Sequence, residues 1–325
     1  MTGQESSEGR VRFSPPASLA VLVGLAWTIL FIALIAPVFV GSALGGKFLA
    51  DLLHAPLLSP VIHAEVWIGG VLLVTWFVRV KLNRAPWSGM ALPRPQLGRL
   101  ALGAFAGASA ILAAFAIEAA AGWAQVVHID LADHRGAPKA AWIVLALLPS
   151  LAVGLAEELS FRGYIFQTLG ERTPVWIAAL LTGIIFGVLH FSLSGFGVSF
   201  VLSVIVISTM FIALRFATGS LWFPIGFHGA WDWTQTYLVG LSTAGAPGYN
   251  PALVQVRVSG PALWIGNGFA IEGGLLFILL SSLVLAIALI YAARHGNAPT
   301  WNARLSRLGP SWSTKQGSQS ASTAA

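Results

Sequence analysis

Eight long apolar stretches constrain this chain more than any other feature of its sequence. Most of them reach the roughly 20 residues that an α-helix needs to cross the hydrocarbon core of a bilayer. They lie at about 19–40, 61–80, 97–122, 141–169, 174–191, 198–216, 220–239 and 273–293. Only 9% of the residues are charged, against about 25% in an average soluble domain, which excludes a water-soluble fold. The sequence predicts an all-α, polytopic membrane helical bundle with about eight transmembrane helices.

The basic residues indicate how these helices are oriented. With eight spans and the N-terminus inside, thirteen Lys and Arg residues, including Arg79 and Arg215, fall on the cytoplasmic side. Four, including Lys139, fall on the opposite side. This positive-inside bias predicts a multi-pass protein of the cell's inner (plasma) membrane with both termini cytoplasmic. It also accounts for the net charge of +6, and no dense basic cluster indicates a nucleic-acid partner.

The rest of the chain indicates one membrane domain. Residues 1–18 are a short polar segment, 19–295 form a single transmembrane domain, and 296–325 have the composition of a disordered cytoplasmic tail. The first apolar stretch is too long for a signal-peptide core and is interpreted as a retained span. Residues 242–271 are a long connector rich in Gly and Pro. Without cysteine the chain has no disulfide, thiolate metal site or cysteine nucleophile.

Ionisable residues inside apolar helices are costly and mark sites. Glu65 and Glu118 lie near the ends of their spans, from which both can reach lipid headgroups. Glu157 and Glu158 are adjacent, and Glu158 has the i, i+4 spacing that pairs it with Arg162. Glu157 then faces about 100° away without a local cation, which suits a general base in an apolar environment. The alternative is that both glutamates belong to one structural ion cluster.

Three more polar residues complete a constellation with Glu157. His190 follows Phe186 by one helical turn, and His228 and Asp232 are again spaced i, i+4. A single histidine is more often a packing residue than a catalyst. If the fourth and fifth helices form a hairpin that protrudes into the cytoplasm and turns near 171–172, Glu157 and His190 come to similar depths, within about 12 Å.

These motifs, in this order, resemble those of the CPBP family, which comprises CAAX proteases and bacteriocin-processing enzymes, also called Abi proteins. The resemblance rests on Glu157-Glu158-x-x-x-Arg162, Phe186-x-x-x-His190 and His228-x-x-x-Asp232. Ser220-Leu221-Trp222 before the second histidine, and Gly260-Pro261 through Glu272-Gly273, match as well. The similarity covers roughly residues 140–275.

The resemblance implies an intramembrane glutamic endopeptidase that needs no cofactor and acts on a peptide or membrane-protein substrate in the bilayer. Glu157 would activate water with the help of His190, and His228 with residue 232 would stabilise the oxyanion. Glu158 and Arg162 would hold the architecture. The family often has Asn where this chain has Asp232, and an ionised Asp accepts hydrogen bonds but cannot donate them. We therefore expect Asp232→Asn to preserve much of the activity.

Three alternatives stay open at this point. Glu157, His190 and His228 are a plausible three-ligand zinc site, although the chain has no His-Glu-x-x-His helix. A non-catalytic member of the same family would serve in bacteriocin immunity, sequestration or scaffolding. A proton-coupled transporter would also use buried carboxylates, but the sequence shows no inverted repeat.

Overall fold

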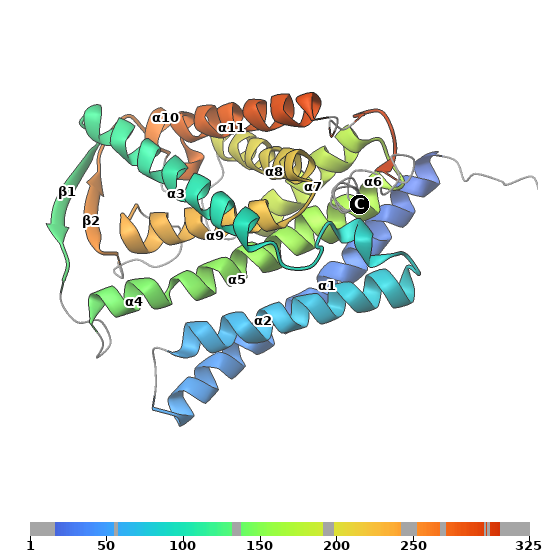
Figure 1. The fold of residues 1–325 in the computed structure, drawn as a ribbon, viewed down its shortest axis with the longest axis horizontal. Coiled ribbons are helices and arrows are strands. Elements are labelled where there is room, and N and C mark those ends of the chain that lie inside the picture. The colour runs from blue at the N-terminus through green and yellow to red at the C-terminus, as the bar shows by residue number, and fades with distance from the viewer. Residues whose placement is uncertain are drawn as a thin grey trace, which may run out of the picture.

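The computed structural model describes residues 17–54, 58–131, 138–190, 198–241, 252–266, 271–295, 297 and 300–305. Nearly all of the predicted polar segment 1–18 and most of the predicted tail 296–325 therefore lie outside the described residues. The described part is mostly helical (Figure 1).

Helices make up most of the elements that the structure describes. The α-helices are α1 (Ala17–Leu52), α2 (Leu58–Trp76), α3 (Leu97–Ala120), α4 (Lys139–Leu145), α5 (Leu147–Glu157), α6 (Phe166–Gly170), α7 (Val175–His190), α8 (Val198–Thr218), α9 (Trp222–Trp233), α10 (Ala262–Ile265) and α11 (Leu275–Arg294). Three π-helical segments, η1 (Phe77–Leu82), η3 (Glu158–Ile165) and η5 (Thr234–Leu238), extend α2, α5 and α9. Two short 3₁₀ segments are η2 (Trp87–Met90) and η6 (Ile271–Gly273).

Among the described residues, five helical stretches are long and apolar enough to cross a membrane, rather than about eight. They are Ser18–Leu52, Ser59–Leu82, Leu97–Ala120, Lys139–Gly170 and Leu275–Arg294. The predicted fifth and seventh spans correspond to the shorter helices α7 and α9. The predicted sixth span corresponds to α8, in which Leu202–Thr218 forms a shorter apolar stretch. In α9 every residue from Pro224 to Trp231 is buried. A helix enclosed by protein has no need to match the thickness of the bilayer, which explains why its length falls short of the predicted span.

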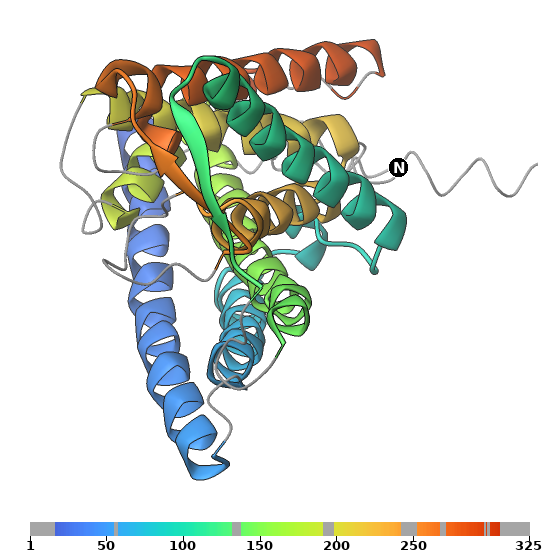
Figure 2. The same ribbon diagram turned by 90° about the vertical axis from the view of Figure 1, so that its left-hand side faces the viewer.

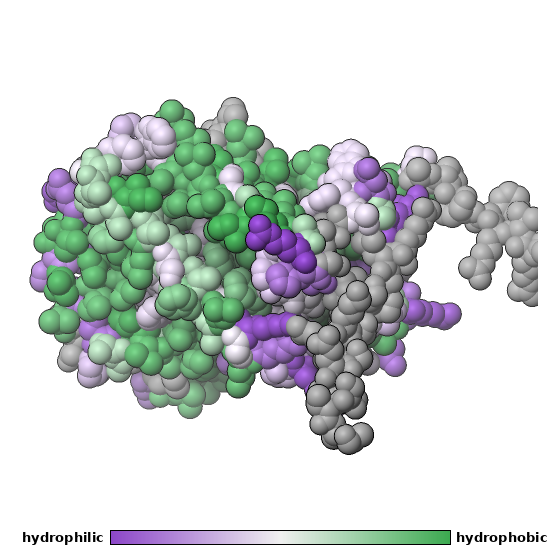
Figure 3. Space-filling view, turned by 45° about the horizontal axis from the view of Figure 1, so that its top comes forward, coloured by the Kyte–Doolittle hydropathy of each residue, from purple (hydrophilic) through white to green (hydrophobic). Residues whose placement is uncertain are grey.

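The outer surface has the character of a membrane protein. Large apolar side chains are exposed along α1, α3 and α11, where a soluble protein would carry polar groups. Figure 3 shows apolar surface over most of one face, with polar side chains gathered toward the end at which α6 lies in Figure 1. The chain is a multi-pass membrane protein.

A two-stranded sheet departs from the all-α prediction. β1 (Ala124–Ile129) pairs antiparallel with β2 (Val254–Val258), with Ala124 opposite Val258 and Ile129 opposite Val254. The strands lie side by side across the end of the bundle opposite α6 (Figures 1 and 2). β2 falls in the connector 242–271, where Val-Gln-Val-Arg-Val has the strict alternation of a half-buried strand.

Glycines bring α9 into backbone contact with the helices beside it. A Cβ at Gly103 or Gly107 of α3 would overlap the carbonyl oxygen of Phe223 or Phe227, and one at Gly226 would overlap that of Leu100. On the other side, a Cβ at Gly154 of α5 would lie 2.8 Å from the Ile225 carbonyl oxygen. Small residues permit such approach where no water drives helices together. α9 is therefore held between α3 and α5 at fixed depth.

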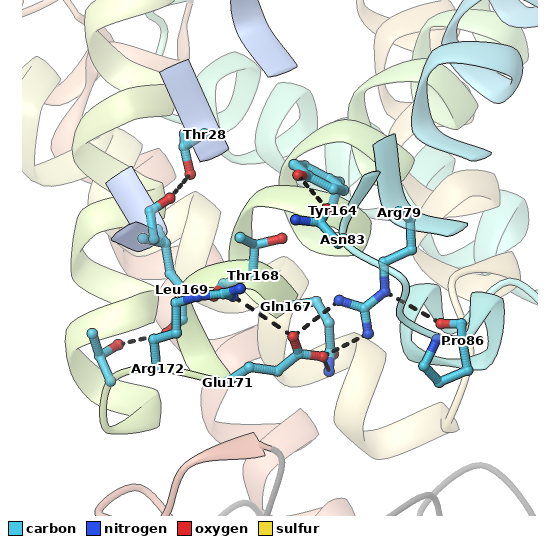
Figure 4. A network of polar contacts seen from close by, with 12 residues as sticks. Thr28, Arg79, Asn83, Pro86, Tyr164, Gln167, Thr168, Leu169, Glu171 and Arg172 are labelled. Atoms are coloured by element: carbon cyan, nitrogen blue, oxygen red, sulfur yellow. Dashed lines mark hydrogen bonds and ion pairs between the residues drawn. The ribbon is translucent and has the colours of Figure 1, made fainter. Parts of the chain in front are cut away.

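A buried ionic network joins α6 to the segments that follow α2. The guanidinium of Arg79 donates to both carboxylate oxygens of Glu171, at 3.0 and 2.6 Å, and its Nε donates to the Pro86 carbonyl (Figure 4). Gln167 also donates to Glu171, at 3.0 Å. Arg215 of α8 donates to Gln167 at 2.7 Å and to the carbonyl of Arg162. The network thereby reaches the helix that carries the two adjacent glutamates.

Three of the basic residues that contribute to the positive-inside bias are not free surface charges. Arg79 is 2% exposed and Arg215 1%, because both are bound in the network just described. Lys139 is 3% exposed and pairs with Asp130 at 2.8 Å. Glu118 also differs from expectation: it is fully buried and cannot reach headgroups. Neither of its carboxylate oxygens has a hydrogen-bond partner among the described residues.

The network predicts an acid-sensitive contribution to stability. Burial alone would raise the pKa of Glu171, but the hydrogen bonds and charge of Arg79 lower it below the ordinary 4.5. The stabilisation is therefore complete above pH 4.5 and is lost as the pH falls toward the lowered pKa. Glu171→Gln should reduce the free energy of unfolding by roughly 2–3 kcal/mol at neutral pH and flatten the dependence of that free energy on acid pH, measured by thermal unfolding in detergent.

Asp51→Asn is the matched control: it breaks the exposed Lys47–Asp51 pair and should lower the free energy of unfolding by less than about 0.5 kcal/mol. Equal losses in both variants would contradict this account.

The chain turns between α6 and α7 at residues 171–174, near the predicted position. The tip of this hairpin does not stand free as predicted, because every residue of α6 is buried. Leu169 packs against Gly24 of α1, and Gly170 packs against Leu305. The Trp176 amide donates to the Trp301 carbonyl at 3.2 Å. Residues 300–305 of the predicted tail are thus packed onto the hairpin.

Candidate active site

Six side chains singled out in the sequence lie together at the boundary between two hydrophobic clusters. Glu157 ends α5, and Glu158 and Arg162 belong to the π-helical η3 that follows. His190 is the last residue of α7, and His228 and Asp232 lie on α9. One cluster contains Phe161 and Phe186 and the other contains Phe211 and Trp231. Two of the three described π-helical segments, η3 and η5, contain or adjoin these residues, and such segments are frequent at functional sites.

Glu157 faces both histidines. Its Oε2 lies 3.8 Å from Nε2 of His190 and 3.8 Å from Nε2 of His228. The carboxylate and the first histidine, 33 positions apart in the sequence, thus fall well inside the 12 Å that the hairpin hypothesis requires. At 3.8 Å the groups attract one another but are too far apart for a direct hydrogen bond.

The other ring nitrogen of each histidine is fixed by a hydrogen bond. Nδ1 of His190 lies 2.8 Å from the Phe186 carbonyl, which can only accept, so that nitrogen carries a proton. Nδ1 of His228 lies 2.9 Å from Oε1 of Glu158. Both imidazoles therefore direct Nε2 toward Glu157, which is the orientation that makes Nε2 available for chemistry.

Glu158 does more than the predicted pairing with Arg162. Its Oε1 accepts a hydrogen bond from Arg162 at 2.9 Å and also receives His228 Nδ1. The Arg162 guanidinium lies 4.6 Å from the ring centre of Phe186 and 4.8 Å from that of Phe211, so two aromatic faces support its charge. His228 stacks on Phe211 at 5.0 Å. Glu158 therefore links the buried cation to the position of an imidazole ring.

The six side chains of the site differ in how far they are exposed. The side chains of Glu158 and Arg162 are 0% exposed, whereas those of Glu157, His190 and Asp232 are 16, 29 and 33% exposed. A substrate can reach the second group but not the first. Asp232 lies on the exposed side, with its Oδ2 3.6 Å from Nε2 of His228.

Glu272 lies next to the site, bonded to Trp231 of α9, although the sequence motifs predict no role for it there. Its Oε1 accepts a hydrogen bond from the indole of Trp231 at 2.8 Å, and its carbonyl accepts one from Ser203. It interacts electrostatically with His228, His190 and Glu157. A signal was present in the sequence, since Asp232 and Glu272 are the only acidic residues after Glu171.

Within the part of the chain that the structure describes, no three His, Asp or Glu side chains form a recognisable metal-binding group. The geometry is that of a carboxylate flanked by two oriented imidazoles, with a further carboxylate, that of Asp232, 3.6 Å from one of the imidazoles. Such an arrangement can activate water and can stabilise a negative charge that develops next to it.

Comparison with known proteins bears on this arrangement. Residues 139–234 match the family model of the type II CAAX prenyl endopeptidase Rce1-like proteins, a family of proteases. The matched region contains all six side chains singled out in the sequence, and the match confirms the resemblance that their motifs indicate. No curated protein and no solved structure matches the chain.

Proposed function

From the match to the type II CAAX prenyl endopeptidase family, we propose that this chain is a membrane-embedded endopeptidase of the glutamic type. It cleaves a peptide bond of a membrane-associated protein or peptide with water activated by Glu157, and it uses no cofactor. The single observation that carries the proposal is the equal 3.8 Å separation of Glu157 Oε2 from Nε2 of His190 and of His228.

That separation suits a water molecule held by the carboxylate and one imidazole. A water oxygen can bridge groups that are too far apart to bond directly. Glu157 removes a proton from the water as its oxygen attacks the peptide carbonyl carbon. The same carboxyl group then gives the proton to the leaving nitrogen, so that the C–N bond breaks and acid and amine products form.

A residue of α9 stabilises the negative charge of the tetrahedral intermediate. Protonated Nε2 of His228 is a donor for the oxyanion, and the Glu158 carboxylate stabilises the positive ring from the other side. This adds a positioning role for Glu158 to its pairing with Arg162. His190, fixed through the Phe186 carbonyl, orients the water.

The location of the reaction follows from the same account. We place the protein in the plasma membrane with both termini cytoplasmic, in keeping with the distribution of basic residues. Exposed polar groups gather at the α6 end (Figure 3), which is accordingly the cytoplasmic end. The substrate approaches Glu157 from the side on which His190 and Asp232 are exposed.

The test is proteolysis by the purified chain reconstituted in liposomes with a mixture of membrane-associated peptides. New N-termini should appear in mass spectra, at a rate that is unchanged after treatment with a strong chelator. The chelator matters because zinc sites also use imidazoles that present Nε2 and donate Nδ1–H to a carboxylate or carbonyl. Loss of activity on chelation, restored by zinc, would replace the glutamic mechanism with a metal-dependent one.

A further inference from the structure

The helix that carries the two adjacent glutamates changes its hydrogen-bond pattern at the site. Glu157 is the last residue of α5, and the π-helical η3 begins at Glu158. In an α-helix the amide of Phe166 would donate to the Arg162 carbonyl, four residues earlier. Here it donates instead to the carbonyl of Phe161, five residues earlier. The Arg162 carbonyl is thereby released from its α-helical donor.

Arg215 of α8 supplies a donor to this carbonyl. Its Nη1 donates to the carbonyl oxygen of Arg162, and its Nη2 donates to the Gly89 carbonyl at 2.9 Å and to Oε1 of Gln167 at 2.7 Å. Its guanidinium lies 5.4 Å from the ring centre of Phe166, the residue whose amide makes the π-helical bond. Arg215 is buried, so bulk water does not compete for these bonds. One guanidinium thus joins η2, η3 and α6.

The helix is anchored on both sides of η3. On the α5 side, a Cβ at Gly154 would lie 2.8 Å from the carbonyl oxygen of Ile225 in α9. On the α6 side, Glu171 receives two hydrogen bonds from Arg79. A π-helical turn holds more residues than an α-helical turn, and each residue of an α-helix turns the chain by about 100°. The orientation of Glu157 toward the two histidines therefore depends on the register of η3 between these anchors.

We propose that Arg215 is a positioning residue of the active site, which holds η3 in its π-helical register by donating to the Arg162 carbonyl. This inference rests on the proposed function. Arg215 acts through the helix rather than on the substrate. The side chain of Arg162 pairs with Glu158 at 2.9 Å, and Glu158 in turn binds Nδ1 of His228 at 2.9 Å. A donor to the backbone of η3 thus fixes the groups on which the orientation of His228 depends.

The first test separates positioning from stability, with kcat and KM measured on a cleavable membrane peptide in liposomes. Arg215→Met removes the donor, and kcat should fall about a hundredfold, the effect of displacing a catalytic group by about 1 Å. KM should stay within about twofold, because the groups that meet the substrate are unchanged. Gln167→Met is the matched control, since it removes one buried partner of Arg215 but leaves the bond to the Arg162 carbonyl. It should lower the unfolding temperature, as Arg215→Met does, and leave kcat within about twofold of wild type.

The second test observes the carbonyl itself and needs no activity. The chain contains two Arg-Gly dipeptides, Arg135-Gly136 and Arg162-Gly163, so carbonyl-¹³C arginine combined with ¹⁵N glycine labels two peptide bonds. Arg135→Lys removes one signal from the solid-state NMR spectrum and thereby assigns the other. A hydrogen bond deshields a carbonyl carbon, so the Arg162 signal should move upfield in Arg215→Met and stay in place in Gln167→Met.

Two results would overturn the inference. One is an Arg162 carbonyl signal that is the same in Arg215→Met and wild type. The other is an equal loss of kcat in Gln167→Met and Arg215→Met, in a wild-type protein that cleaves peptides, since Arg215 would then serve stability alone. Where Arg215→Met does not fold, Arg215→Lys carries both comparisons, because a single ammonium does not replace the two-armed guanidinium. A wild-type protein that cleaves no peptide would overturn the proposed function and the positioning role with it, and the carbonyl signal would still show whether Arg215 binds η3.

Discussion

Replacing Glu157 by glutamine is expected to lower the cleavage rate by a factor on the order of 10³ without changing the unfolding temperature. The amide has nearly the shape of the carboxylate but cannot take a proton from water. Glu157 is 3.8 Å from each histidine and makes no short ion pair with them, so little folding energy depends on its charge. The rate is measured in liposomes with a cleavable membrane peptide, and stability by thermal unfolding in detergent.

Glu65→Gln is the matched control for this variant. Glu65 is an exposed glutamate of α2, in a helix of similar apolar character, and its neutralisation should leave the rate unchanged. If Glu157→Gln retained more than about a tenth of the wild-type rate, Glu157 would not be the general base.

Replacing Glu158 by leucine is expected to destabilise the fold by about 3–5 kcal/mol, because it leaves the buried Arg162 without its carboxylate. Both side chains are 0% exposed, so water cannot solvate the unpaired guanidinium. The same change removes the acceptor of His228 Nδ1, and activity should be lost with it. Thermal unfolding and cleavage are measured on the same preparations.

A double variant separates the two roles of Glu158. Removing both charges in Glu158→Leu/Arg162→Leu should restore part of the lost stability, because an apolar pair is often tolerated where a single buried charge is not. Activity should stay lost, since His228 remains without its acceptor. Recovery of activity along with stability would show that Glu158 serves only to balance Arg162.

The chemistry of the site could be predicted from spacing, because chemistry-bearing residues are rare in an apolar chain. The i, i+4 spacing of Glu158 and Arg162 predicts their contact, which the structure places at 2.9 Å. The bond from Glu158 to His228 spans 70 residues, and no local pattern specifies such a contact. Glu272 was missed for the same reason: only the folded chain brings it to Trp231.

The fold was predictable where lipid exposure dictates composition and not where protein surrounds the helix. α2, α3 and α11 lie close to the predicted spans. α1 continues to Leu52 and is about 54 Å long. Its second half packs along α2, where Gly46 lies against the backbone of His63. α9 is short because backbone contacts at its glycines, not lipid, determine its environment.

The measurement that tests the central claim most directly is substrate capture by the Glu157→Gln protein in native membranes, read by mass spectrometry. We expect this variant to retain an intact membrane-associated protein or peptide, which the wild-type protein converts into two fragments with a new N-terminus. The claim would be contradicted if both proteins retained the same intact partners and neither produced fragments, since Glu157 would then serve binding without hydrolysis.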